Sequence, residues 1–171
     1  VYIPCGMGDA PAGLCFGLKL VFRDAVRVYT AEPVMAPAMP LALGTKRYHQ
    51  ISTRELGLNP QNTVADELAV TKISGPSCFV MRELLDGCVT ASDDQILAML
   101  ATIYDVEELR LEPSGVCGLA AFADLMRSNI SLKAPQGTHI VWISSGGLLP
   151  GNVWQRFYDK GKKWAPGAQN A

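Results

Sequence analysis

The sequence lacks several features that would assign it to common classes of protein. No stretch reaches the roughly 18 consecutive apolar residues that a membrane-spanning helix needs, and residues 1–6 carry none of the basic side chains that open a signal peptide. Its 15 Lys and Arg residues are balanced by 16 Asp and Glu residues, and no basic stripe interleaved with aromatics is present for nucleic-acid binding. We therefore expect a cytoplasmic protein that binds neither a membrane nor nucleic acid.

Cysteine is present, but in no pattern that builds a disulfide framework or a zinc site. The five cysteines are an odd number, form no C-x-x-C pair and have no histidine at ligand spacing: Cys5, Cys15, Cys78, Cys88 and Cys117. This pattern favours reduced thiols in a cytosolic protein.

The order of apolar segments predicts an α/β fold, with a mostly parallel β-sheet flanked by helices. The 171 residues, 49% of them hydrophobic, suffice for one domain with a substantial core. Short β-rich segments alternate with segments of helical period, which is typical of βαβ units. The expected strands are residues 1–4, 26–31, 88–91, 109–111 and 138–144, and the expected helices are residues 14–22, 93–104, 115–127 and 151–160. We expect a single domain over residues 1–162 and a flexible tail at 163–171.

The helix expected at 93–104 has the strongest local signals. Its apolar residues recur on one face, and Ser92 is well placed as the N-cap with Gln95 three residues later.

A glycine-containing loop, PCGMGDAPAG, connects the first expected strand to a helix-like segment. Gly6, Gly8 and Gly13 lie where backbone N–H groups gather at a helix N-terminus, which favours a bound anion. The spacing matches neither G-x-G-x-x-G nor the Walker pattern, so an ordinary tight turn is an equal alternative. Asp9 is unexpected in such a loop, because its carboxylate would repel a phosphate.

Two more expected strands end in polar residues. Residues 138–147 read THIVWISSGG, and Glu32 directly follows the strand expected at 26–31. Ligands of open α/β sheets collect at the carboxyl ends of strands, so Ser144 and the glycine loop are candidates to contact one ligand; a helix-capping serine is the alternative. Glu32 is a candidate cation ligand together with loop carbonyls, although capping of the neighbouring turn is favoured.

Taken in order, these segments resemble the C-terminal part of fold-type II pyridoxal-phosphate enzymes, which are tryptophan synthase β-like, and most closely the D-serine dehydratases. The resemblance covers nearly the whole chain and is carried by VYIPCG, FGLKLVF, AEP with a proline four residues on, QISTRELGL, NTVADELAV, RELLDG, RLEPSGVCGLA and THIVWISSGGLLP. It implies pyridoxal 5'-phosphate as cofactor, a small amino acid as substrate, and a lyase that converts D-serine to pyruvate and ammonia.

The resemblance also implies the residues of the site. Backbone N–H groups of the glycine loop would bind the cofactor phosphate, and those residues are Gly6, Met7, Gly8, Asp9 and Ala10. Ser144 would face the pyridine nitrogen, where a hydroxyl gives a moderate electron sink. A cation, monovalent in some of these enzymes, would bind Glu32 and the carbonyl of Ala36, with only the backbone of Ala38 at a further ligand position.

The chain departs from the family in three ways. The lysine that carries the cofactor belongs to the N-terminal half of these enzymes, and Lys19, Lys46 and Lys72 do not match its motif. Alanine or aspartate replaces glycine at positions 9, 10 and 12, and Glu67 stands in ADELAV where the family reads A-D-G-L-A-V. Added bulk and negative charge beside a dianionic ester predict that cofactor binding is lost. We expect no catalytic residue in this chain.

Two functions remain open. The first is a portion of a D-serine dehydratase that is inactive alone and whose lysine lies on an N-terminal half; a start on a buried strand without Met fits this reading. The second is a degenerate homologue kept as a structural or interaction module. An isolated half of an enzyme should expose apolar surface, which favours a homo-oligomer or docking of the missing half.

Overall fold

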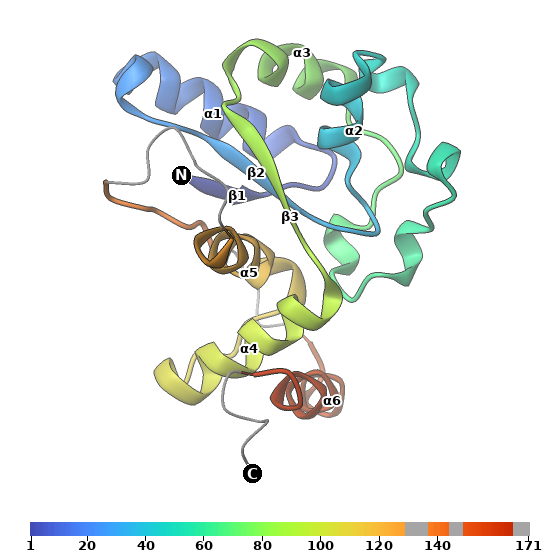
Figure 1. Ribbon diagram of the computed structural model, residues 1–171, viewed down its shortest axis with the longest axis vertical. Coiled ribbons are helices and arrows are strands. Elements are labelled where there is room, and N and C mark those ends of the chain that lie inside the picture. Colours follow the sequence, from blue (N-terminus) through green and yellow to red (C-terminus); the bar gives the residue numbers. More distant parts are fainter. Residues whose placement is uncertain (129–136, 144–148, 166–171) are drawn as a thin grey trace.

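A parallel sheet forms the centre of the molecule. The computed structural model describes residues 1–128, 137–143 and 149–165. Three strands, β1 (Tyr2–Pro4), β2 (Tyr29–Pro33) and β3 (Gly87–Ala91), are hydrogen-bonded in the order β1-β2-β3, and both pairings are parallel (Figure 1). A single parallel bridge joins Tyr2 to Val141 on the free side of β1. The α/β class with a parallel sheet is confirmed.

β2 lies between the other two strands and all five of its residues are buried. A strand buried on both faces reads as a continuous run of largely uncharged side chains, so Glu32 near its end is an exception that needs partners. The register aligns Ile3, Thr30 and Cys88 across the sheet. Successive residues point to opposite faces, and each face is therefore covered by its own helices.

Helices cover the sheet on both faces. α1 (Asp9–Phe22), α2 (Ala38–Thr45) and α3 (Gly75–Leu84) lie on one face and share a core with Ile3 of β1 and Cys88 of β3. α5 (Pro113–Arg127) packs on the other face, against Tyr2 and Tyr29. α4 (Asp93–Glu107) and α6 (Gly151–Lys162) pack together beyond α5 (Figure 1). The short 3₁₀ turns are Arg23–Ala25, Tyr48–Gln50, Thr53–Leu56, Pro60–Asn62 and Asp66–Leu68.

The expected helices are confirmed, with small shifts at the ends of α4, α5 and α6. α1 begins at Asp9 and not at 14, so residues 9–13 of the expected loop are already helical. α4 begins with the expected capping box, in which the Gln95 N–H donates to Ser92 Oγ at 3.3 Å and the Ser92 N–H donates to Gln95 Oε1 at 2.8 Å. α2 and α3 were not expected, because prolines near their starts read as loop signals. Proline is tolerated in the first turn of a helix, where its missing N–H has no intrahelical partner.

One expected strand is wrong. Residues 109–111 form no strand and connect α4 to α5 directly. Glu108, the C-cap of α4, is left-handed at φ 56°, and α5 begins at Pro113, so residues 109–112 only link the two helices. The strand expected at 138–144 is reduced, within its described residues 138–143, to the bridge at Val141.

All five cysteines are free thiols, as expected. Among the helices of the described residues, none combines the length and the apolar character that crossing a bilayer requires.

α4 and α6 cross at a glycine, and this contact gives a first test of the fold. A Cβ on Gly161 would overlap the backbone carbonyl of Leu97, whereas a Cβ on Gly17 of α1 would meet nothing within 4 Å. Gly161→Ala is expected to lower the free energy of unfolding by about 1–3 kcal/mol, because α6 must move away from α4. The matched control, Gly17→Ala, should be neutral or raise it by up to about 1 kcal/mol. Urea denaturation measures both, and equal stability of the two variants would contradict the close crossing.

Candidate functional site

The loop between β1 and α1 requires glycine at two positions. Gly8 is the N-cap of α1 and has φ 98°, a left-handed conformation that favours glycine. A Cβ there would lie 2.9 Å from Ile73 Cδ1 and 3.0 Å from Met81 Cε. A Cβ on Gly6 would lie 2.9 Å from the carbonyl oxygen of Glu67. The chain therefore passes from β1 to α1 with no space for a side chain at positions 6 and 8.

The N-terminus of α1 presents free donors beside this passage. Asp9 and Ala10 are the first two residues of α1, and N–H groups in the first turn of a helix have no intrahelical acceptor. No side chain caps Gly8, and the next residue, Pro11, has no N–H. The two N–H groups and the positive end of the helix dipole therefore form a site that fits a phosphate group.

A pocket of ≈ 250 Å³ lies at the carboxyl end of β1. Ala10 of the loop and Ser114 at the start of α5 both contribute to it. Its full lining is Ile3, Pro4, Ala10, Leu14, Glu67, Leu68, Ser114 and Trp142. The structure thus brings together the glycine loop, the ADELAV segment and the residues beside Val141. No lysine lines this pocket among the described residues. Ser144, the predicted partner of the ring nitrogen, lies outside the described residues.

Ser114 and Trp142 are pocket residues that the sequence reasoning missed. Ser114 follows the proline that begins α5, is 3% exposed, and its Oγ accepts the Glu67 N–H at 3.2 Å. The signal that could have found it is EPSG, in which a polar residue follows a proline at the first position of a helix. This bond ties the Asp66–Leu68 turn, and with it the carbonyl that faces Gly6, to α5.

Asp9 is turned toward α3. Its Oδ1 accepts the Ser77 hydroxyl at 2.6 Å and the Ser74 hydroxyl at 2.8 Å. These two bonds lower the pKa of Asp9, so the side chain stays ionised at neutral pH. Asp9 lines a groove between α1 and α3 with Phe16 and Val80, and it does not line the pocket at β1. Of the two acidic departures from the family, only Glu67 borders that pocket.

Glu32 is fully buried at the end of β2. Its two carboxylate oxygens accept the Met39 N–H, at 3.1 and 3.2 Å, in the first turn of α2. Burial raises the pKa of Glu32 to about 8, against the opposing effect of hydrogen bonds from Cys5 and from the backbone of Met39 and Ala38. These contacts match the capping role that the sequence favoured. The carbonyl of Ala36, the other predicted cation ligand, accepts the Ala38 N–H at 3.0 Å.

No ready-made metal centre accompanies these two residues. Across the part of the chain that the structure describes, no three His, Cys, Asp or Glu side chains are grouped to hold a metal ion.

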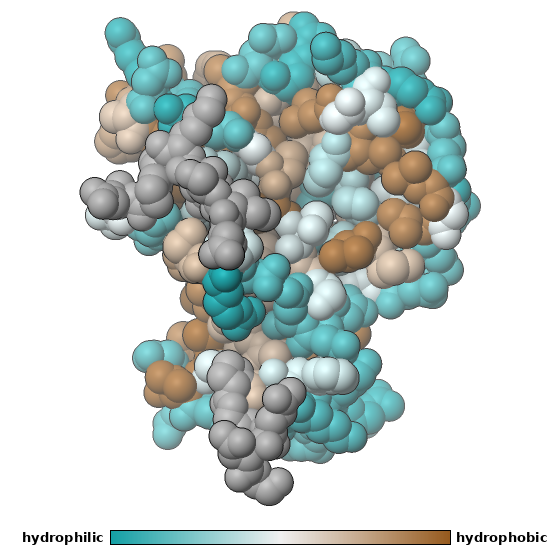
Figure 2. Space-filling view, viewed as in Figure 1, coloured by the Kyte–Doolittle hydropathy of each residue, from teal (hydrophilic) through white to brown (hydrophobic). Residues whose placement is uncertain are grey.

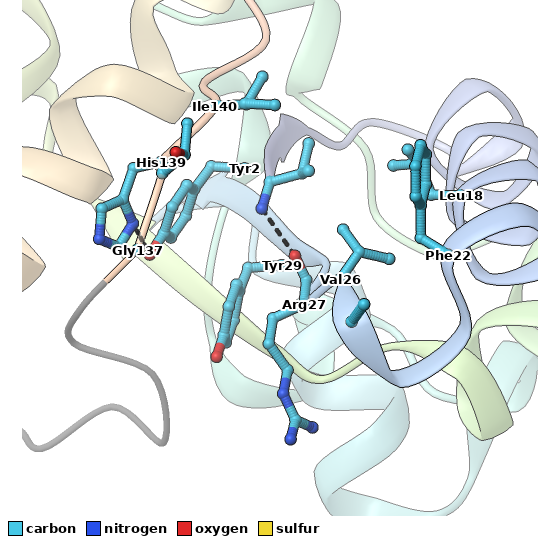
Figure 3. Close-up of a pocket in the computed structure, with 12 residues that line it drawn as sticks. Tyr2, Leu18, Phe22, Val26, Arg27, Tyr29, Gly137, His139 and Ile140 are labelled. Atoms are coloured by element: carbon cyan, nitrogen blue, oxygen red, sulfur yellow. Dashed lines mark hydrogen bonds between the residues drawn. The ribbon is translucent and has the colours of Figure 1, made fainter.

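A second pocket, of ≈ 340 Å³, lies at the amino ends of the strands. Figure 3 shows Tyr2, Tyr29 and Arg27 on one side of it and Leu18 and Phe22 on the other. It is at the opposite end of the sheet from the glycine loop, where parallel α/β sheets do not place their ligands. We therefore assign the candidate site to the carboxyl end of β1.

Comparisons with known proteins show the family of the chain. A family model described as "Pyridoxal-phosphate dependent enzyme" matches residues 1–146. A probable D-serine dehydratase from Shouchella clausii is 40% identical over 161 residues, which are 94% of this chain and 36% of that protein. The chain spans little more than a third of the length of the curated relatives it matches.

Solved structures with the same fold include a threonine deaminase and a serine racemase. The processed form of threonine deaminase isoform 2 from Solanum lycopersicum is 25% identical, with a TM-score of 0.75 over 93% of this chain and 43% of that one. Maize serine racemase is 24% identical, with a TM-score of 0.74 over 92% of this chain and 47% of that one, which shows the fold alone.

The raised pKa of Glu32 predicts how stability depends on pH. The ordinary pKa of 4.5 applies to the unfolded chain and the pKa of about 8 to the folded chain, so the folded state holds the extra proton between these values. The contribution of Glu32 is complete below pH 4.5 and is lost as the pH rises to about 8, at up to about 1.4 kcal/mol per pH unit.

Glu32→Gln should flatten this slope, because the amide does not titrate. Chemical denaturation between pH 5 and 9, in a tetramethylammonium buffer without small cations, measures the effect. Glu83→Gln is the control, since the Glu83 side chain is 73% exposed and its replacement should leave the slope unchanged. Equal slopes for the parent and Glu32→Gln would contradict a protonated, buried Glu32.

Proposed function

The chain belongs to the family of pyridoxal-phosphate dependent enzymes, and we propose that it is the cofactor-binding C-terminal portion of a D-serine dehydratase. Relatives named probable D-serine dehydratase match nearly all of it. The observation that carries the proposal is the left-handed Gly8, which brings two free N–H groups of α1 to the carboxyl end of β1. The reaction proposed for the assembled enzyme is β-elimination of D-serine to pyruvate and ammonia.

The sequence predicts that cofactor binding is lost, but Asp9 is turned toward α3 and does not line the pocket at β1. We therefore propose that the residues of the loop still fit the phosphate of the cofactor. The N–H groups of Asp9 and Ala10 would bind it at the start of α1, together with the backbone of Gly6, Met7 and Gly8. Ser144 is the proposed hydroxyl partner of the ring nitrogen. When bound, pyridoxal phosphate supplies an electron sink for the bonds at the substrate α-carbon. The chain's own contribution is to hold and orient that group in the pocket between the loop and Ser114.

The chain alone is proposed to be inactive, because the described residues bring no lysine to the pocket. Lys19 pairs with Asp86 at 2.6 Å near the amino ends of the strands, and Lys162 pairs with Asp105 at 2.6 Å on α4. We assign the lysine that carries the cofactor to the part of the longer relatives that this chain does not span.

The partner surface proposed for that remaining part is apolar. Figure 2 shows apolar surface gathered where the sheet and α1 to α3 lie, in the upper part of the view (Figure 2). Large apolar side chains of α1 and α3 are more than half exposed, namely Phe16, Leu20, Val21, Phe22 and Phe79. Contiguous exposed apolar surface marks sites of association, and a second copy of the chain is the alternative occupant.

The second candidate function is a non-catalytic module of the same fold. It is favoured by Glu67, an exposed carboxylate that borders the pocket where the family has glycine. A negative charge there opposes binding of an anionic ester.

A chimera distinguishes the two candidates. This chain would replace the segment it matches in the Shouchella clausii relative, and pyruvate would be measured after addition of D-serine and pyridoxal phosphate. We expect pyruvate from the chimera and none from the chain alone. Gly8→Ala in the chimera should abolish activity, whereas Gly13→Ala, whose Cβ would meet nothing within 4 Å, should preserve it. A folded chimera without activity, even after Glu67→Gly, would contradict the proposal and support the module.

A monovalent cation is proposed to bind Glu32 and the carbonyl of Ala36. Because the Glu32 carboxyl group is protonated below a pKa of about 8, the cation must displace its proton. We therefore expect K⁺ to raise the thermal midpoint of the chain at pH 8.5 and to have little effect at pH 6. Glu32→Gln should abolish the K⁺ effect, with tetramethylammonium as the control cation. A K⁺ effect that is equal at both pH values, or that survives in Glu32→Gln, would contradict this site.

A further inference from the structure

Three side chains join the glycine loop to α3. Asp9 begins α1, Ser74 is the N-cap of α3, and Ser77 lies in the first turn of α3. Both serine hydroxyls donate to Asp9 Oδ1, at 2.8 and 2.6 Å, and the two hydroxyl oxygens are 2.5 Å apart. In addition, the Ser74 N–H donates to the carbonyl of Met7 at 2.9 Å. We call the group Asp9, Ser74 and Ser77 the clasp.

We propose that the clasp is a positioning device for the anion-binding loop. It fixes the loop against α3 and holds the carboxylate of Asp9 on the α3 side, away from the pocket at β1. The inference rests on the proposed function, because the anion concerned is the phosphate of the cofactor.

The clasp holds the loop on both sides of Gly8, its left-handed residue. Met7 is held through its carbonyl and Asp9 through its carboxylate, and between them the space that a Cβ of Gly8 would need is filled by Ile73, Met81 and Ser77. Three consecutive residues are thus attached to one neighbouring segment. A loop that is already ordered loses less conformational entropy when it binds a ligand, so its N–H groups bind an anion more tightly.

The clasp also determines which hydrogen-bond donors the carboxylate of Asp9 contacts. A carboxylate in the first turn of a helix, such as that of Asp9, is attracted to the unpaired N–H groups at the positive end of the helix dipole. Without its serine partners, the Asp9 side chain would be free to rotate onto the donors of α1 and compete with an external phosphate. Ser77 is 3% exposed, so its hydroxyl has no competing contact with bulk water. The two hydroxyls keep the carboxylate occupied and leave the helix N–H groups available.

The clasp and simple charge repulsion by Asp9 predict different changes in phosphate affinity when the serine hydroxyls are removed. If Asp9 only repelled the anion, removal of the serines would change phosphate affinity little, and Asp9→Gly alone would raise it strongly. If the clasp positions the loop and restrains the carboxylate, removal of the serines must weaken binding. Removal of Asp9 as well must then restore part of the affinity, because no free carboxylate remains.

The experiment measures binding of inorganic phosphate and of pyridoxal phosphate to the full chain by isothermal titration calorimetry. Ser74→Ala/Ser77→Ala should weaken binding about tenfold, in line with the loss of two hydrogen bonds to a charged group. Adding Asp9→Gly to that double variant should recover at least about threefold of the loss, a non-additive effect. Ser52→Ala is the matched control. Ser52 caps the remote 3₁₀ turn Thr53–Leu56 in a capping box with Glu55, so this variant should bind phosphate and pyridoxal phosphate like the parent.

Two results would overturn the clasp. One is a double serine variant that binds as tightly as the parent; the other is a triple variant that binds no better than the double, which would indicate only damage to α3. Amide hydrogen exchange of residues 7–10 separates this failure from that of the proposed function. The clasp predicts faster exchange in the double serine variant without any ligand, and unchanged exchange contradicts it. Absence of phosphate and pyridoxal phosphate binding in the parent would contradict the proposed function and the anion role, whatever the exchange shows.

Discussion

The tight passage from β1 into α1 is the constraint on which the rest of the site depends. Gly8 takes a left-handed conformation with side chains of Ile73, Ser77 and Met81 at the position of a Cβ, so the chain can turn only at a glycine. The turn places the first N–H groups of α1 at the end of the sheet where ligands of parallel α/β proteins bind. The position of the pocket, the contact with α3 and the direction of Asp9 all follow from it.

Two carboxylates, Asp9 in the first turn of α1 and Glu32 in β2, differ in charge at neutral pH because their surroundings differ: Asp9 is negative and Glu32 is neutral. Asp9 is exposed and receives two hydroxyl hydrogen bonds, which lower its pKa and keep it ionised. Glu32 is buried, and loss of hydration raises its pKa to about 8 despite the N–H groups of α2. The negative charge near the loop is therefore confined to exposed side chains, and the interior below the loop carries little charge. Such an interior is compatible with an anionic ligand at the loop.

The candidate site and a cluster of ion pairs lie at opposite ends of the sheet. The carboxyl end of β1 carries the pocket and the anion-binding loop, whereas the amino ends of the strands carry the cluster of Lys19, Arg27 and Asp86. α4 and α6 pack beyond α5 and contribute no residue to the pocket lining. In the proposed function, a second body of protein covers the loop and encloses the substrate. The longer relatives have the additional length for one.

The sequence by itself determined the α/β class, α4 with its capping box, the glycine loop at the start of α1, and the family through a series of segments in fixed order. These features follow from local propensity, hydrophobic period and turn chemistry, which short stretches encode. The irregular connection at 109–111 and the helices α2 and α3 were not predictable, because the alternating Leu-Arg-Leu of 109–111 resembles a strand and prolines near a helix start resemble a loop. Ser144 lies outside the described residues, so its role stays a prediction. Only the tertiary structure decided the direction of Asp9 and the protonation of Glu32. The hydroxyls that hold Asp9 lie 65 and 68 positions away along the chain, and burial of Glu32 is a property of the assembled core, which no local pattern specifies.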